Sequence, residues 1–159
     1  HSYGHEKAGV DPTRSLLLRM TREKAIIDAV EPLVATHMRP RQLYNHSSGS
    51  SAVRRLAEKV GRLDRLLRVC RADTAGRPPL PPGDFPEGEW LLERAQKLNV
   101  ASGRPDPLVR GRDLIKIGIE PGPQMGKILK QLFEDQLDGK FEDREGGLIR
   151  AREIREPLN

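Results

Sequence analysis

The chain contains few of the residues that form cross-links, stack on bases or cross membranes. Its 159 residues include one cysteine, Cys70, and only six aromatic side chains. A single cysteine excludes an internal disulfide framework and is typical of the reducing cytoplasm. Six scattered aromatic residues are too few for a base-stacking sheet or a single-strand groove lined by rings. No apolar run approaches the ~18 residues of a membrane span, so we expect a soluble, cytoplasmic protein that has no membrane partner.

Positive charge is concentrated in one part of the chain. The formal net charge is +5, but residues 39–77 alone carry ten arginines and lysines against three acidic residues. The rest of the chain is therefore slightly acidic. A polyanion should be attracted to this one region rather than to the whole surface. Within it, Arg62, Arg65, Arg68 and Arg71 recur every three residues, a pattern that is also typical of a solvated helix face.

Apolar residues recur at helical spacing along most of the chain, and no segment alternates with period two for long. The sequence therefore predicts an all-α fold. We expect helices at the following places: Asp11 to Met20, Thr21 to His37, Ser50 to Asp73 with an interruption at Gly61, Glu89 to Leu98, Gly111 to Ile117, Met125 to Leu137 and Glu145 to Arg155. Residues 39–50 end in Asn, His, Ser and Gly and are expected to form a loop.

A proline-rich segment marks the expected domain boundary. The stretch "AGRPPLPPGDFPEGE" is rich in proline and glycine and is typical of an extended connector. We expect a first helical domain over residues 1–76, a connector over 77–88 and a second helical domain over 89–159.

A Pro-Gly-Pro turn precedes the most regular helical stripe of the sequence. Proline ends one helix at Pro121 and suits the first turn of the next at Pro123. The unpaired N–H groups after Gly122 would then point outward, near Lys127 and Lys130, and such a helix start can hold a phosphate. The same turn can also serve only to reverse the chain, with Gly126 permitting close packing.

His5, His37 and Asp73 are candidate metal ligands. Imidazole nitrogen and carboxylate oxygen bind divalent transition metals or Mg²⁺, and each of these residues lies on or beside an apolar helical face. Their spacing alone is equally typical of a hydrogen-bonded core histidine and a helix-terminal aspartate.

Two long stretches carry a resemblance to one family. The first part, "HSYGHEKAG…LLLRM…IIDAVEPLVATHMRP…SAVRRLAEKV…LLRVCRADTAGR", resembles the second half of an HD domain, the helical metal-dependent phosphohydrolase fold found inside bacterial class II tRNA nucleotidyltransferases and poly(A) polymerases. The second part, "DFPEGEWLLERAQKLNV…PLVRGRDLIKIGIEPGPQMGKILKQLFEDQLDGKFEDREGGL", is similar to the C-terminal helical region of that family. The turn pattern "GRDLIKIGIEPGPQMGKIL" is the most specific feature.

The resemblance implies an incomplete HD-like helical bundle followed by a small C-terminal helical domain. It makes His5, His37 and Asp73 the later metal-ligand positions of an HD domain, with a divalent metal, Mg²⁺ or a transition metal, expected in the parent protein. The family's His-Asp pair and its nucleotidyl-transferring Asp-x-Asp do not occur in this sequence. We therefore assign no catalytic residue and no certain cofactor to this chain, and expect it to be an inactive fragment of an enzyme.

The resemblance implies that the chain positions tRNA or another structured RNA while an upstream catalytic head adds nucleotides from CTP or ATP at the 3′ end. RNA would be held through phosphates and A-form shape, with weak sequence preference. The candidate RNA-binding residues are Arg54, Arg55, Arg62, Arg65, Gly122, Gly126, Lys127 and Lys130.

Two other interpretations stay open from the sequence. The chain can be part of a metal-dependent HD phosphohydrolase whose remaining ligands lie upstream of His1. It can also be a structural module that forms a homodimer through the apolar stripe from Met125 to Leu137.

Overall fold

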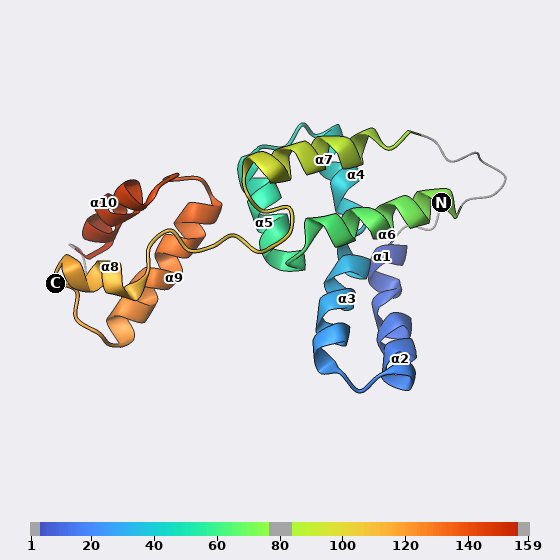
Figure 1. Cartoon of the computed structure of the whole chain (residues 1–159), viewed down its shortest axis with the longest axis horizontal. Helices are drawn as coiled ribbons and strands as arrows, with labels where there is room; N and C mark the ends of the chain where they lie inside the picture. Colours follow the sequence, from blue (N-terminus) through green and yellow to red (C-terminus); the bar gives the residue numbers. More distant parts are fainter. Residues whose placement is uncertain (1–3, 77–83, 156–159) are drawn as a thin grey trace. The chain divides into compact units, whose positions relative to one another are not determined.

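Helices are the regular secondary structure of the described part of the chain, as the sequence predicts. The computed structural model describes residues 4–76 and 84–155, and within these ranges no strand occurs. The helices are α1 (His5–Ala8), α2 (Val10–Met20), α3 (Lys24–Thr36), α4 (Arg39–Asn45), α5 (Ser50–Val60), α6 (Leu63–Ala75), α7 (Pro86–Lys97), α8 (Gly111–Lys116), α9 (Pro123–Leu137) and α10 (Arg144–Arg155). The expected all-α class is confirmed (Figure 1).

The chain forms two compact units, each with its own apolar core. Unit 1 covers His1–Arg104 and unit 2 covers Pro105–Asn159. The core of unit 1 is built mainly by α5, α6 and α7, whose fully buried side chains include Val53, Leu63 and Leu91. The core of unit 2 centres on Leu114, Ile128 and Leu132, which lie on α8 and α9.

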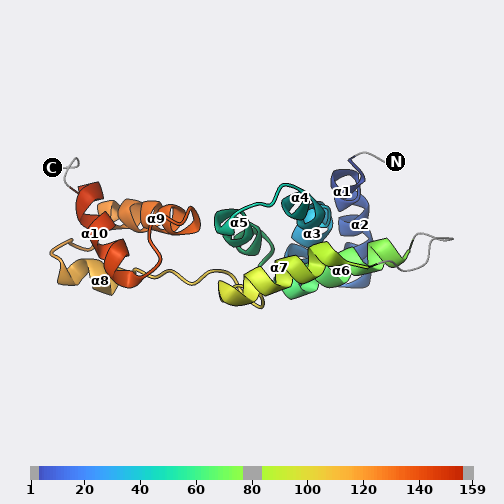
Figure 2. The ribbon, with the colours of Figure 1, turned by 90° about the horizontal axis from the view of Figure 1, so that it is seen from above.

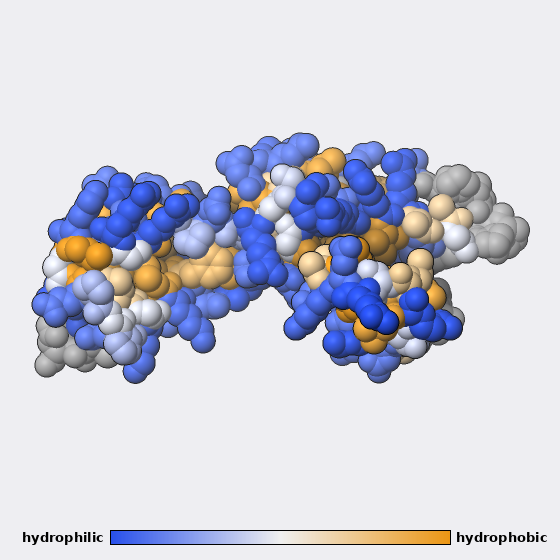
Figure 3. Space-filling model, turned by 60° about the horizontal axis from the view of Figure 1, so that its bottom comes forward, coloured by the Kyte–Doolittle hydropathy of each residue, from blue (hydrophilic) through white to orange (hydrophobic). Residues whose placement is uncertain are grey.

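A helical hairpin of α2 and α3 extends from unit 1 (Figure 1). Helix α3 buries Ile27, Leu33 and Thr36, but α2 buries none of its residues completely. The large apolar side chains of Leu18 and Met20 are 58% and 74% exposed. In Figure 3, hydrophobic residues (orange) interrupt a largely hydrophilic surface (blue).

The expectation of a loop over residues 39–50 was wrong for its first half. Residues Arg39–Asn45 form α4, which begins with Pro40 in its first turn and packs against α7. Leu43 is buried in the core of unit 1, and the Tyr44 ring meets the Trp90 ring edge-on with centroids 6.0 Å apart. Packing against α7 therefore stabilises a short helix whose sequence alone resembles a loop.

The interruption at Gly61 separates α5 from α6, as the sequence predicts. Gly61 has φ = 71° and donates its N–H to Ala57 O, which ends α5 in a backbone conformation that favours glycine. The next helix starts two residues later at Leu63, a fully buried side chain.

Helix α7 packs inside unit 1, although the sequence analysis assigned it to the second domain. It contacts α4, α5 and α6 (Figure 2). Its Leu91 and Ala95 are fully buried in the core of this unit. Residues 77–83 of the expected connector lie outside the described residues. The two compact units divide at Arg104 and Pro105, downstream of that connector.

Within its described residues, unit 2 contains helices α8, α9 and α10, which are held together by buried polar groups as well as by an apolar core. Asp113 accepts a hydrogen bond from the Arg110 backbone N–H at 2.9 Å and another from Arg144 of α10. Gln136 of α9 binds the loop before α8, accepting from Leu108 N and donating to Asp106 O. These contacts explain the Gly-x-Asp-Leu pattern physically: its aspartate connects the start of α8 to α10.

The apolar stripe of α9 is buried within unit 2. Met125, Ile128, Leu132 and Leu137 are each at most 8% exposed, and the first three belong to the core that α8 and α10 complete. Leu129 and Phe133 of the same stripe are half-buried. Most of the apolar surface that a homodimer would use is therefore covered within unit 2, and the homodimer stays a prediction.

Candidate functional site

The structure brings His5, His37 and Asp73 together from three different helices. His5 is the first residue of α1, His37 follows the last residue of α3, and Asp73 lies in the last turn of α6. One ligand atom from each lies within 4.8 Å of the other two, and all three residues are half-buried. The sequence separation of these residues is large, so this cluster depends on the packing of α1 and α6 against α3.

Hydrogen bonds fix the orientation of the His37 ring. Its Nδ1 lies 2.7 Å from Val34 O, and because a carbonyl oxygen can only accept, Nδ1 carries the proton and donates. A neutral His37 then presents the lone pair of Nε2, which lies 2.9 Å from His5 Nε2. The outer hydrogen bond to a backbone carbonyl is the arrangement that usually orients a histidine ligand.

The donor set fits a divalent cation. Metal–nitrogen distances of about 2.1 Å place two ligands at right angles about 3 Å apart, which agrees with the two Nε2 atoms. Two imidazoles and one carboxylate favour a transition metal over Mg²⁺, since Mg²⁺ prefers oxygen ligands. The described residues supply three ligands to such a cation, so solvent or a bound substrate would complete its coordination shell.

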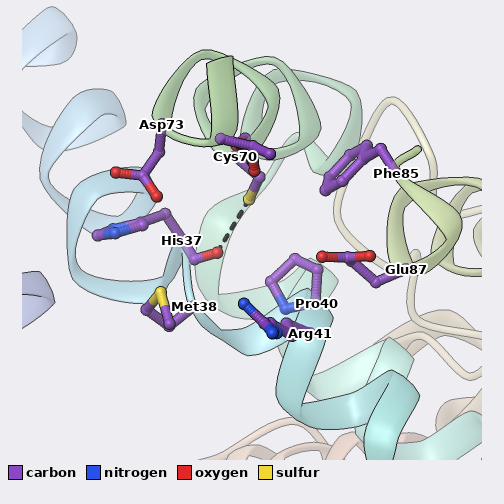
Figure 4. A pocket seen from close by; sticks show the side chains of 9 residues that line it. His37, Met38, Pro40, Arg41, Cys70, Asp73, Phe85 and Glu87 are labelled. Carbon is purple, nitrogen blue, oxygen red and sulfur yellow. Dashed lines mark hydrogen bonds between the residues drawn. The ribbon is translucent and has the colours of Figure 1, made fainter. Parts of the chain in front are cut away.

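Cys70 lies beside this cluster and was not considered as a site residue from the sequence. Its Sγ donates a hydrogen bond to His37 O at 3.0 Å (Figure 4). Burial, together with the nearby Asp73 charge, raises the pKa of the Cys70 thiol to about 12. It therefore stays a neutral thiol at physiological pH and supports the backbone that carries His37.

A small cavity adjoins His37, Asp73 and Cys70. Its volume is about 20 Å³, which is room for about one water molecule. Figure 4 shows the Asp73 carboxylate next to the His37 ring, with Arg41 and Glu87 at the other side of the cavity.

The four arginines predicted for RNA binding differ in their environments. Arg55 and Arg65 are exposed on α5 and α6, and Arg54 is half-buried. Arg62 forms a two-point ion pair with Asp64, from Nε at 2.8 Å and Nη2 at 2.7 Å. The hydrogen bonds from Arg62 lower the pKa of Asp64, and although burial acts in the opposite direction, the pKa lies below its usual value. Arg62 therefore has a structural task at the start of α6.

The predicted residues of the Pro-Gly-Pro turn lie together at the start of α9 in unit 2. Gly122, Gly126, Lys127 and Lys130 are all exposed. A Cβ added at Gly126 would have no heavy atom within 4 Å. Close packing inside the described residues therefore does not explain this glycine, and the first turn of α9 presents a bare backbone to solvent.

A wider groove on unit 1 was missed by the sequence analysis. It has a volume of about 650 Å³, and its lining includes the basic residues Lys7, Arg39, Arg55 and Lys59. The available signal was the spacing of Ser51, Arg55 and Lys59 at i, i+4 and i+8, which places them on one face of α5.

Comparisons with known proteins relate most of the chain to one group. It is 37% identical over 105 residues to the multifunctional CCA protein of Pasteurella multocida (strain Pm70), a match that covers 60% of this chain and 24% of that protein. It is 30% identical over 107 residues to the multifunctional CCA protein of Haemophilus influenzae (strain PittGG), covering 63% of this chain and 26% of that protein.

No family model and no solved structure matches the chain. None of the helices in the described residues is long and apolar enough to cross a membrane. The chain spans about a quarter of the length of the curated relatives it matches, and over that part it is similar to multifunctional CCA proteins.

Proposed function

We propose that this chain binds tRNA and positions its 3′ end for nucleotide addition by a catalytic head that is not part of the sequence. The similarity to two multifunctional CCA proteins carries this proposal. The absence of an Asp-x-Asp from the sequence agrees with a binding role, because nucleotidyl transfer by two metals requires paired carboxylates. The CTP and ATP substrates, like the addition reaction, belong in this proposal to the whole parent protein.

Charge is the physical basis of the proposed RNA contact. Arg55 and Arg65 are exposed in the basic segment of unit 1, and Lys127 and Lys130 are exposed near the start of α9. Contacts to phosphates carry no base information, so we expect weak sequence preference and a strong dependence on salt. The bare backbone at Gly126 would allow a phosphate to approach the first turn of α9.

Titration with tRNA and with duplex DNA of equal charge, over ~50 to 300 mM salt, tests the proposal. We expect tighter binding to tRNA and a steep loss of affinity as salt rises. Arg65→Ala with Lys130→Ala should weaken binding and flatten the salt dependence. Arg22→Ala with Lys24→Ala, which removes two charges at exposed positions around the start of α3, is the matched control. Equal, feeble binding of both nucleic acids would contradict the proposal.

The cluster of His5, His37 and Asp73 favours a second candidate function, a metal-dependent phosphohydrolase of the HD type. Its donors fit a divalent transition metal, which would polarise a phosphoryl oxygen or a bound water. Calorimetric titration with Mn²⁺ and Ni²⁺ tests this candidate, with hydrolysis of phosphomonoesters as a second readout. Binding that is lost in His37→Ala and Asp73→Asn but kept in His46→Ala, an exposed histidine after α4, would support it. Absence of metal binding by the unaltered chain would contradict it.

A further inference from the structure

We propose that the groove between α1, α4 and α5 of unit 1 binds the backbone phosphates of one strand of a folded RNA. This inference rests on the proposed function and specifies a surface for it. No residue of the groove other than Arg55 was among the candidates from the sequence.

The groove has the size and composition of a binding site rather than of a packing defect. Its volume is about 650 Å³, within the range of ~300 to 1,000 Å³ that ligand sites occupy. Residues of α1, α3, α4 and α5 line it, so four helices meet at the groove. Beside its charged residues, the lining includes the small or apolar side chains of Ala35, Ala52 and Leu56.

Helix α5 carries a row of three side chains that can each contact a phosphate. Ser51, Arg55 and Lys59 are four residues apart, so their positions lie on one face at intervals of ~6 Å along the helix axis. Together these three side chains present one hydroxyl group and two cations along this face. That spacing is close to the distance between successive phosphates of an extended nucleic-acid strand.

The charge of the groove favours a polyanion. Lys7, Arg39, Arg55 and Lys59 line it together with one acidic residue, Glu6. Arg39 is exposed and donates from Nη1 to Gln42 Oε1 at 3.0 Å, so the guanidinium is held at the groove by a second lining residue. No tyrosine, tryptophan or phenylalanine lines the groove, so the bound strand would be held by charge and not by base stacking.

The groove adjoins the candidate metal cluster. Glu6 and Lys7 directly follow His5, and Met38 directly follows His37 and lines both the groove and the small cavity at Asp73. A strand in the groove would therefore pass beside His5 and His37. The regular ~6 Å spacing of Ser51, Arg55 and Lys59 and the similarity of the chain to multifunctional CCA proteins favour RNA over an acidic protein segment.

Charge reversal in the groove tests the proposal. We expect the double variant Arg39→Glu with Lys59→Glu to bind tRNA at least ~10-fold more weakly than the unaltered chain at ~100 mM salt, with a salt slope smaller by about two. The matched control is Arg22→Glu with Lys24→Glu, which makes the same change of charge at exposed positions. The control positions lie far from the groove, because Lys24 begins α3 and Thr36, which lines the groove, ends that helix ~18 Å away along its axis. The variant Lys59→Arg keeps the charge and should therefore retain most of the affinity of the unaltered chain. Circular dichroism checks that all variants keep their helical content.

The outcomes separate this inference from the proposed function. If the unaltered chain binds tRNA and the groove variant weakens binding no more than the control, the groove is overturned and the function stands. If the unaltered chain does not bind tRNA, both fail. Competition decides the ligand class: displacement of tRNA by polyglutamate of equal charge, as readily as by unlabelled tRNA, would overturn RNA as the occupant. Displacement by adenosine monophosphate at similar concentration would overturn a strand in favour of a single nucleotide.

Discussion

At the scale of single residues, unit 2 depends on carboxylates that are buried yet ionised. Asp135 is only 1% exposed, but it accepts hydrogen bonds from Lys140, Arg150 and Gln131. Burial raises its pKa, and the three donors together outweigh burial, so the pKa of Asp135 lies below its usual value. The carboxylate therefore stabilises the fold only while it remains charged.

This balance predicts that unit 2 loses stability in acid. A carboxyl whose pKa is lowered by folding stabilises the protein above its unfolded pKa of about 4, and this contribution is lost as pH falls through the lower folded value. Thermal unfolding followed by circular dichroism between pH 6 and pH 3 should show a falling melting temperature. Asp135→Asn should melt lower at pH 6 and depend less on pH. Asp106→Asn, which changes an exposed carboxylate of the same unit, is the control, and equal pH dependence of Asp135→Asn and the unaltered chain would contradict the prediction.

At the scale of elements, two glycines that each occupy the fourth position of a helix have opposite environments. A Cβ added at Gly147 of α10 would lie 2.5 Å from Val109 Cγ2 and 2.9 Å from Phe141 Cε2. At Gly126 of α9 the same atom would meet nothing within 4 Å. Gly147 thus allows α10 to approach the core, whereas Gly126 leaves a helical surface open.

The two alanine substitutions should therefore change stability in opposite directions. Gly147→Ala should destabilise by about 1–3 kcal/mol, because the added methyl group overfills a packed contact. Gly126→Ala should stabilise by about 0.5–1 kcal/mol, because it lowers the entropy of the unfolded chain at an exposed helical position. Urea unfolding measures both values. An unchanged free energy of unfolding for Gly147→Ala would show that Val109 and Phe141 can move apart to admit the methyl group. Separately, unchanged tRNA binding by Gly126→Ala would remove Gly126 from the proposed RNA contact.

The sequence predicts long amphipathic helices well and short ones poorly. The stripe of α9 spans four turns, so its periodicity was sufficient to predict it. Helix α4 has seven residues and only two buried positions, Pro40 and Leu43. Its contact with α7 decides its conformation, and periodicity carries no information about that contact.

The candidate site shows a similar division. The ligand types of His5, His37 and Asp73 could be picked from the sequence, because such side chains are unusual beside apolar faces. Their distances depend on three helices meeting, as does the groove, whose Lys7 and Arg39 come from different helices. The sequence alone could not distinguish Arg62, which pairs with Asp64, from the solvent-exposed arginines that follow it at the same spacing.

At the scale of the whole molecule, the two cores predict two unfolding transitions. Each unit has its own buried cluster of apolar residues. The one tryptophan of the chain, Trp90, lies in unit 1, so its fluorescence reports on that unit alone. Domains with separate cores can unfold separately.

Asp135→Ala should then affect only one transition. In urea, the midpoint reported by Trp90 fluorescence should stay unchanged, while the midpoint of the second phase seen by circular dichroism should fall. We expect a loss of about 2 kcal/mol for unit 2, since Lys140 and Arg150 are partly exposed and can regain water. A Trp90 midpoint that falls in parallel would show instead that the two units unfold as one.

The ion pairs of α10 also determine when unit 2 can form during synthesis. Asp113 receives Arg144 from 31 residues further along the chain, and Asp135 receives Arg150 from 15 residues further. A nascent chain that ends after α9 lacks Arg144 and Arg150, so both carboxylates are without these partners. It also lacks Gly147, and with it the contact of α10 with Val109. Because a ribosome makes a chain from its N-terminus, unit 1 can fold while unit 2 is still incomplete, and unit 2 must wait until α10 has left the exit tunnel.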